Sequence, residues 1–282
     1  MIKLFSSDLD GTLLGKPDAT ISFTKNWDAL PEEDRPVLCY NSGRLLNDTL
    51  EVVTNSGLPE PQYLICGVGT MIYHTADKKL LKEFTQTLTL NWDLALVEDA
   101  VNRHFHLEKQ PSKYQNKFKS SWYWHGASPE ELSALKRQIT HSGLKVNIIY
   151  SSSRDLDIIP EYANKGNSLV WLLDTLSLVP EEVVVAGDSG NDSSMFRIPG
   201  VRGIIVENAQ PELFEATVDL PTFVSLKPCG DGVFDGLLHY GVLKTILPLD
   251  EGERREASRD PVIRYVLGNQ AARSLMEVEL SL

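Results

Sequence analysis

Short apolar runs alternate with amphipathic segments in both the first and the last third of the chain. The runs at 3–9, 37–40 and 183–186 each have the length of a strand, and the last is apolar throughout. A wholly apolar strand is typical of a parallel sheet that is covered on both faces. Apolar residues also recur at helical spacing between these runs, as in 45–53 and 169–176. The pattern therefore predicts an α/β fold built on a parallel sheet.

The middle of the chain has a different pattern, in which two helical segments are interleaved with three β-prone ones. In chain order, these segments are 91–105, 117–124, 129–141, 144–150 and 155–159. The order of helix, strand, helix, strand and strand predicts a compact α+β unit. One β-prone segment carries Trp122, Tyr123 and Trp124, which could either stack on a sugar ring or fill the core of this unit.

These changes of pattern predict the domain organisation. We expect a discontinuous core formed by residues 1–83 and 161–248, with an inserted domain at 84–160. The remaining segment, 249–282, reads as a charged C-terminal extension.

Composition narrows the classes of function. The chain has 27 Lys and Arg against 39 Asp and Glu, which gives a formal net charge of −12. Such a chain repels nucleic acid and anionic membrane surfaces, so we expect neither as a partner. The three scattered cysteines argue against a disulfide framework and against a zinc site. The pattern contains neither a signal peptide nor a transmembrane segment, so a cytoplasmic location is expected.

Two acidic loops follow predicted strands, DLDGT at 8–12 and GDSGND at 187–192. In an open α/β sheet, ligands bind outside the carboxyl ends of the strands, so both loops should open on one crevice. Carboxylates that converge there repel one another unless a cation lies among them. Hard oxygen ligands suit Mg²⁺, which binds a few carboxylates together with a substrate phosphate. The loops therefore predict a Mg²⁺ site for a phosphate ester.

Asp8 and Asp10 are two residues apart, so in an extended chain they point to the same side. A carboxylate nucleophile can split phosphate-ester hydrolysis into two steps through an aspartyl-phosphate. Asp10 could protonate the leaving alkoxide and then deprotonate the attacking water. The alternative is that DLDGT is only a strand-ending turn, since Asp and Gly favour turns.

Two weaker signals concern the phosphate. Ser42-Gly43-Arg44 ends the second predicted strand and opens a helix, where a hydroxyl and backbone N–H groups can bind an anion. The alternative is that Ser42 is an ordinary N-cap, and Gly57 is expected to end the same helix. Lys165-Gly166 precedes another helix, and a solvated lysine is the alternative there.

Taken in order, these motifs resemble those of the haloacid dehalogenase-like phosphatases. The resemblance implies a Rossmann-like parallel-sheet core with an inserted α+β cap. It also implies that Asp8 is the nucleophile and a Mg²⁺ ligand, and that Asp10 is the general acid and base and a ligand through its carbonyl. By the same resemblance, Ser42, Gly43 and Lys165 bind the phosphoryl oxygens, Asp188 is the last direct metal ligand, and Asn191 and Asp192 support it.

A closer resemblance, to the sucrose-phosphate phosphatase group, extends to about residue 243. It rests on DLDIIP (155–160), ANKG (163–166), MFRIPGV (195–201) and VENAQ (206–210). In that group the cap supplies the sugar contacts. KFKSSWY starts at residue 117, where the group has a Lys-x-Ser-aromatic strand, which makes Lys119 a candidate substrate contact.

The sequence therefore predicts a Mg²⁺-dependent phosphomonoesterase for a sugar phosphate, with sucrose 6-phosphate as the first candidate. Phosphatases for mannosylglycerate, glucosylglycerate or hexose phosphates are alternatives, and so is a phosphomannomutase-like phosphotransferase. The intact Asp10 argues against the transferase. The presence of Asp8, Lys165 and Asp188 argues against a non-catalytic binding protein. A glycosyltransferase that supplies the substrate is a candidate partner.

Overall fold

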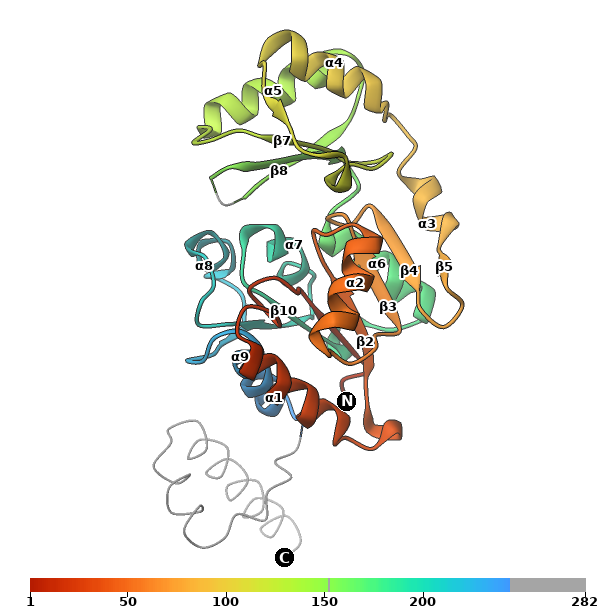
Figure 1. The fold of residues 1–282 in the computed structure, drawn as a ribbon, viewed down its shortest axis with the longest axis vertical. Helices are drawn as coiled ribbons and strands as arrows, with labels where there is room; N and C mark the ends of the chain where they lie inside the picture. Colours follow the sequence, from red (N-terminus) through yellow and green to blue (C-terminus); the bar gives the residue numbers. More distant parts are fainter. Residues whose placement is uncertain (152, 244–282) are drawn as a thin grey trace, which may run out of the picture. The chain divides into compact units, whose positions relative to one another are not determined.

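The computed structural model describes residues 1–151 and 153–243, which contain one eight-stranded and one four-stranded sheet (Figure 1). The predicted extension at 249–282 lies outside the described residues. Within these ranges, no helix combines the length and the apolar character that crossing a bilayer requires.

The larger sheet has the strand order β12-β11-β10-β1-β2-β3-β4-β5. Neighbouring strands are parallel from β12 to β3, and β4 and β5 are antiparallel additions at one edge. The strands are β1 (Leu4–Ser7), β2 (Val37–Asn41), β3 (Tyr63–Cys66), β4 (Met71–His74), β5 (Lys79–Leu80), β10 (Val183–Gly187), β11 (Arg202–Ile205) and β12 (Thr222–Val224). The central strand β1 pairs with β2 and β10, so their carboxyl ends lie side by side.

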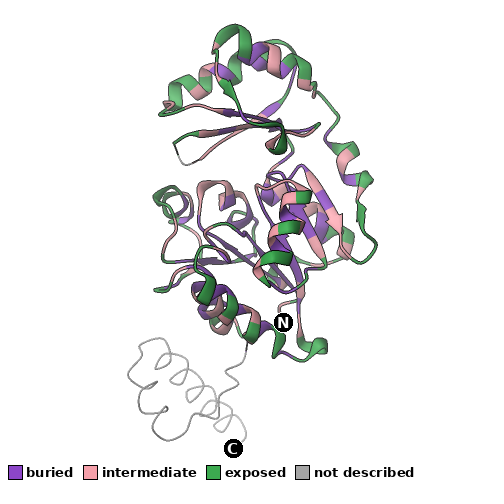
Figure 2. Cartoon of the chain, in the orientation of Figure 1, coloured by how far each residue is buried: buried purple, intermediate pink, exposed green. Residues whose placement is uncertain are grey.

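Helices cover both faces of this sheet, as the apolar strands predict. They are α1 (Pro17–Asp28), α2 (Leu46–Ser56), α3 (Lys82–Thr87), α6 (Lys165–Leu176), α7 (Ser193–Phe196), α8 (Pro211–Thr217) and α9 (Cys229–His239). Alternate residues of β1 enter different hydrophobic clusters, because successive side chains of a strand point to opposite faces. Leu4 packs in the cluster of α6 and α7, and Phe5 packs in the cluster of α1 and α9; both are fully buried. Figure 2 shows how the burial concentrates along these strands.

The smaller sheet is antiparallel, with the order β6-β7-β9-β8. Its elements are α4 (Leu94–His104), β6 (Glu108–Lys109), β7 (Ser120–Tyr123), α5 (Pro129–His141), β8 (Val146–Ser151) and β9 (Asp155–Pro160). The predicted order of this α+β unit is confirmed, except that the two-residue β6 is too short to leave a pattern. A short 3₁₀ segment, η2 (Ser112–Tyr114), links β6 to β7.

One face of the small sheet packs on α4 and α5, and the other face carries polar residues together with Ile149 and Ile159, which pack in the core cluster of the large sheet. Trp122 is 1% exposed in the cluster with these helices, and Trp124 packs against that cluster. Trp122 therefore fills the core of the unit, and the half-buried Trp124 packs at its edge. Ser121 and Asp157 are cross-strand partners on the other face and are hydrogen-bonded to each other at 2.6 Å.

Ser42 is not the N-cap of α2, because that helix begins at Leu46. The amide of Ser42 donates to the carbonyl of Ile65 at 2.8 Å, which continues the pairing of β2 and β3. The hydroxyl of Ser42 accepts from the amide of Arg44 at 3.2 Å in a tight turn. The other end of the helix is as predicted, since Gly57 ends it in the left-handed conformation at φ 70°.

Candidate active site

A buried lysine joins two carboxylates at the carboxyl end of β1. Lys165, the first residue of α6, donates from Nζ to Asp8 Oδ1 and to Asp192 Oδ1, both at 2.6 Å. Its side chain is 0% exposed, so the alternative of a solvated lysine is wrong. Asn164 caps α6 by accepting from the amide of Asn167 at 2.7 Å, and this cap fixes where Lys165 begins the helix.

The two acidic loops meet at this point, as the strand ends predict. Thr12 Oγ1 lies 3.3 Å from Asp8 Oδ2 and 3.2 Å from Asp188 Oδ1, so one hydroxyl links the loops after β1 and β10. Oxygens of Asp8, Asp188 and Asp192 all lie within 4.8 Å of one another. The loops therefore form one buried carboxylate cluster.

The cluster holds more negative than positive charge. Burial raises the pKa of Asp8 to about 7, against the lowering effect of Lys165. Burial also raises the pKa of Asp188 to about 8, and the charge of Asp8 adds to this. For Lys165, burial lowers the pKa, but Asp192 and Asp8 outweigh it and keep the lysine protonated. One ammonium thus faces three carboxylates, an imbalance that a divalent cation would correct.

The donor set fits a hard cation such as Mg²⁺. Both carboxylate oxygens of Asp192 already accept hydrogen bonds. Its Oδ1 accepts from Lys165, and its Oδ2 accepts from the amides of Asp188 at 3.1 Å and Ser189 at 3.0 Å. These bonds shape the loop and leave oxygens of Asp8 and Asp188 for an ion. In the same loop as Asp188 and Asp192, Asn191 Oδ1 is buried with no hydrogen-bond partner among the described residues. Carboxylate and amide oxygens are the ligands that Mg²⁺ prefers.

Gly11 allows the first loop to approach the second. It has φ +83°, and a Cβ at this position would lie 2.3 Å from Asp188 Oδ2. Its carbonyl accepts from Asn208 Nδ2 at 2.8 Å, which holds the turn. Any larger residue would be strained in this conformation and would collide with the carboxylate.

Asp10 lies outside the buried cluster and is held by an arginine. Arg44 donates to both carboxylate oxygens of Asp10 at 2.7 Å, and its third nitrogen donates to Asp48 at 2.9 Å. The side chain of Asp10 is 53% exposed, so solvent or a leaving group can reach it. No motif of the sequence points to a role for Arg44 or Asp48. The i, i+4 spacing of Arg44 and Asp48 indicates that these two residues can pair. The pairing of Arg44 with Asp10 has no local pattern, because the two residues are 34 positions apart.

The predicted phosphate-binding residues surround this site. Ser42 is buried at the end of β2, and Gly43 follows it. The neighbouring Asn41 donates to the backbone carbonyl of Lys165 at 3.0 Å, so the end of β2 is tied to the start of α6. Ser42, Gly43 and Lys165 therefore lie at neighbouring strand and helix ends.

Lys119 lies immediately before β7 of the small sheet and is already paired. Its Nζ donates to Ser121 Oγ at 2.7 Å and forms an ion pair with Asp157 at 2.7 Å. The side chain of Lys119 is 5% exposed and that of Asp157 is 16% exposed. The sequence pattern put Lys119 inside a strand, whereas β7 begins one residue later, and it gave no sign of these partners.

Comparison with known sequences identifies relatives over most of the chain. The family model "Sucrose-6F-phosphate phosphohydrolase" matches residues 1–241. A mannosylfructose-phosphate phosphatase from Agrobacterium fabrum is 42% identical over 242 residues, covering 86% of this chain and 98% of that protein. Plant sucrose-phosphatases are longer, and the chain spans 60–61% of their length.

Solved structures share the fold. A sucrose-phosphatase from Synechocystis, determined with sucrose and phosphate, is 28% identical with a TM-score of 0.78, covering 86% of this chain and 99% of that one. A haloacid dehalogenase-like hydrolase from Bacillus subtilis is 15% identical with a TM-score of 0.61, covering 86% of this chain and 95% of that one.

Proposed function

Because this chain belongs to the sucrose-6F-phosphate phosphohydrolase family of haloacid dehalogenase-like phosphatases, we propose that its substrate is a phosphorylated disaccharide. Sucrose 6-phosphate is the first candidate, and mannosylfructose phosphate is the second because of the 42% identity to the Agrobacterium enzyme. The proposed chemistry rests on the different burial of two carboxylates in one loop. Asp8 is buried against Lys165, whereas Asp10 reaches solvent.

In this mechanism, a carboxylate oxygen of Asp8 bonds to phosphorus as the bond from phosphorus to the sugar oxygen breaks. Asp10 gives its proton to that sugar oxygen. Asp10 then takes a proton from the water that hydrolyses the aspartyl-phosphate, which releases phosphate and restores Asp8. Lys165, Ser42 and Gly43 hold the phosphoryl oxygens throughout.

We propose that Mg²⁺ is the resident cation, bound by the carboxylates of Asp8 and Asp188 and by the carbonyl of Asp10. Asn191 and Asp192 support these ligands without binding the ion directly. When bound, the ion offsets the negative charge of the carboxylates and the phosphate.

Replacing Asp188 with asparagine should separate stability from activity. In EDTA the variant should melt at a higher temperature than the wild type, because it removes one of the crowded buried carboxylates. It should also lose most of the Mg²⁺-induced rise in melting temperature and need at least about tenfold more Mg²⁺ for activity. Thermal melts and Mg²⁺ titrations measure both effects, and Asp174→Asn on the exposed side of α6 is the control. Full wild-type activity in EDTA would contradict the proposed metal site.

We propose that the small sheet with α4 and α5 is the cap that selects the sugar, inserted between the core segments 1–83 and 161–248. Phe84, at the start of the expected insertion, packs on Trp171 with ring centroids 5.4 Å apart. Helix α3 therefore packs with the core, and the inserted domain begins after α3.

We also propose a cytoplasmic location, since all three cysteines are free and buried.

Lys119→Ala should lower kcat/KM for the natural sugar phosphate by at least about tenfold, because a charged donor is lost. Hydrolysis of p-nitrophenyl phosphate should change far less, since it has no sugar. The variant also leaves Asp157 unpaired, so Lys119→Met/Asp157→Leu is the matched control for packing. If the double variant restores kcat/KM, Lys119 has only a structural role.

The proposed substrate is tested by phosphate release from a panel ranked by kcat/KM. The panel contains sucrose 6-phosphate, mannosylfructose phosphate, glucosylglycerate phosphate, mannosylglycerate phosphate, hexose phosphates and p-nitrophenyl phosphate. We expect a disaccharide phosphate to rank first by at least about tenfold. Transfer of the phosphoryl group to a second sugar without release would instead favour the mutase-like alternative.

A further inference from the structure

The turn between β3 and β4, residues 67–70, holds the loop at 42–44, to which phosphate binding is assigned. The amide of Gly67 donates to the carbonyl of Arg44 at 2.7 Å, and the amide of Val68 donates to the carbonyl of Ser42 at 3.2 Å. These two carbonyls stand on either side of Gly43. The β3–β4 turn therefore fixes the backbone of the loop at 42–44 from both ends.

Val68 has a backbone conformation that a valine rarely adopts. Its φ of 58° lies in the left-handed region, which the branched side chain of valine disfavours. Val68 is 2% exposed, and a Cβ at Gly43 would lie 3.8 Å from Val68 Cγ2, at van der Waals distance. Strain of this kind persists where the surrounding structure imposes it, and it concentrates at functional sites. The strained valine that packs against Gly43 therefore points to a role for this turn.

The same turn also contacts the start of α6, where Lys165 lies. The carbonyl of Gly69 accepts from Ser168 Oγ at 2.8 Å. Gly69 has φ +83°, and a Cβ there would lie 2.3 Å from the carbonyl oxygen of Asn164, so glycine is needed for this close approach. The β3–β4 turn thus sets the loop at 42–44 and the residue Lys165 relative to each other.

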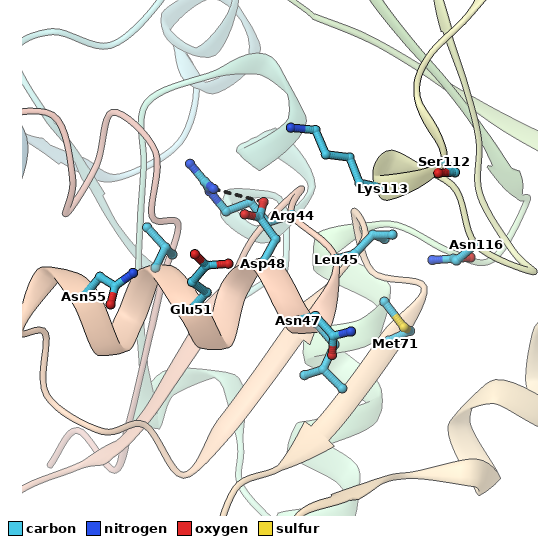
Figure 3. Close-up of a pocket in the computed structure, with 12 residues that line it drawn as sticks. Arg44, Leu45, Asn47, Asp48, Glu51, Asn55, Met71, Ser112, Lys113 and Asn116 are labelled. Carbon is cyan, nitrogen blue, oxygen red and sulfur yellow. Dashed lines mark hydrogen bonds and ion pairs between the residues drawn. The ribbon is translucent and has the colours of Figure 1, made fainter.

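The hydroxyl of Thr70 connects this turn to the cap. Thr70 is fully buried, and its Oγ1 donates to the carbonyl of Gly67 at 2.9 Å and accepts from Asn116 Nδ2 at 2.9 Å. Asn116 lies between η2 and β7, and its Oδ1 accepts from the amide of Phe118 at 2.6 Å, which orients the side chain. Figure 3 shows Asn116 from the cap and Met71, the residue after Thr70, lining the same cavity. A displacement of Asn116 with the cap would therefore act directly on the turn.

We propose that the β3–β4 turn is a positioning element, which sets the loop at 42–44 against Lys165 and links both to the cap through the bond between Thr70 and Asn116. Val68 and Thr70 act through the backbone of the phosphate site rather than on the reacting atoms. The inference rests on the proposed function, since it concerns the site that holds the phosphoryl group. It requires that the affinity for phosphate, and not only the stability, depends on these side chains.

The role of Val68 is tested by Val68→Ala and Val68→Gly. Thermal melts in Mg²⁺ with increasing inorganic phosphate give the stability and the Kd for phosphate, and assays with p-nitrophenyl phosphate give kcat/KM. In both variants we expect Kd to rise about threefold to tenfold and kcat/KM to fall at least about tenfold, because the loop loses its support. Val68→Gly should nevertheless melt at a higher temperature than Val68→Ala, because glycine adopts the left-handed conformation without strain.

Val183→Ala is the matched control for the loss of a buried valine. Val183 is 0% exposed, belongs to the same hydrophobic cluster as Val68, and begins β10 at the edge of the sheet opposite the site. This control should lower the melting temperature and leave the Kd for phosphate within about twofold of wild type. If both Val68 variants behave in the same way, Val68 only fills the core and the positioning role is refuted.

The link to the cap is tested by Thr70→Val, Asn116→Ala and the double variant, with Thr217→Val as the control for a buried hydroxyl. Inorganic phosphate carries no sugar, so a lost sugar contact cannot explain a change in its Kd. We expect each single variant to raise this Kd at least about threefold. The double variant should exceed Thr70→Val by less than about twofold, because both changes break the same bond. An unchanged Kd in Asn116→Ala, or effects that multiply in the double variant, would refute the link.

The wild type tests the proposed function separately. If it binds inorganic phosphate and hydrolyses no phosphate ester, the proposed function fails, and the Kd values alone decide the role of the turn. If it hydrolyses p-nitrophenyl phosphate and prefers no disaccharide phosphate, only the substrate assignment fails. Absence of phosphate binding by the wild type would overturn both proposals.

Discussion

Asp8→Asn should abolish turnover on every phosphate ester, with a loss of at least about 10⁴-fold in kcat. The amide cannot form the bond to phosphorus, and neither Asp192 nor Asp10 is free to replace it. Asp192 is engaged by Lys165 and two backbone amides, and Asp10 is held by Arg44. Phosphate release with sucrose 6-phosphate and with p-nitrophenyl phosphate measures the loss.

The same variant should keep its fold, which separates this loss from unfolding. Lys165 retains its bond to Asp192 Oδ1 at 2.6 Å when Asp8 becomes neutral. The crowding of buried carboxylates also falls, so the melting temperature in EDTA should equal or exceed that of the wild type. Asp18→Asn, which makes the same change at an exposed position of α1, should have wild-type activity. Turnover by Asp8→Asn within tenfold of wild type would refute Asp8 as the nucleophile.

The positions of the two acidic loops could be predicted because they depend on local patterns. An apolar strand followed by DLDGT or GDSGND marks a strand end, and parallel strands place such ends at one edge of the sheet. The structure confirms this, since Thr12 lies between Asp8 and Asp188. The boundaries of α5 could also be predicted locally, since Pro129 stands in its first turn and Gly143 follows its end.

The contacts that tune the site could not be predicted, because they join residues that are distant in the chain. Arg44 reaches Asp10 across 34 residues, and Lys165 reaches Asp8 across 157. Lys119 illustrates the same limit within the cap. The adjoining strand β7 was predicted, but the ion pair of Lys119 with Asp157 depends on the register of β7 and β9.

Asp8 and Asp10 show why these contacts matter for the chemistry. The two side chains have the same carboxyl group and lie in one loop, yet one is 7% exposed and the other is 53% exposed. Burial beside Lys165 suits a group that attacks a phosphorus atom deep in the site. Exposure to solvent suits a group that exchanges protons with the leaving sugar and with water, and Arg44 fixes the position of this carboxylate. The tertiary fold therefore gives the two carboxylates the different environments that their proposed roles require.

Lys165→Met should both inactivate the enzyme and destabilise it. Methionine is similar in length to lysine but leaves Asp8 and Asp192 without their shared buried cation. Removing one partner of a buried ion pair costs about 3–5 kcal/mol. For a domain of this size, that corresponds to a fall of roughly 6–20 °C in melting temperature. Turnover should fall by at least about 10³-fold, because the phosphoryl oxygens lose a cationic contact.

A second substitution distinguishes the two effects of Lys165→Met. Adding Asp192→Asn removes one of the stranded charges and should recover part of the melting temperature, measured in EDTA and in Mg²⁺. It should not recover turnover, because the amide supplies no charge to the phosphate. Asp192 Oδ2 also accepts from two loop amides, so an asparagine whose oxygen faces those amides keeps the loop in place. If the double variant regained activity together with stability, Lys165 would be a structural residue, and the phosphate would have to be held by other groups.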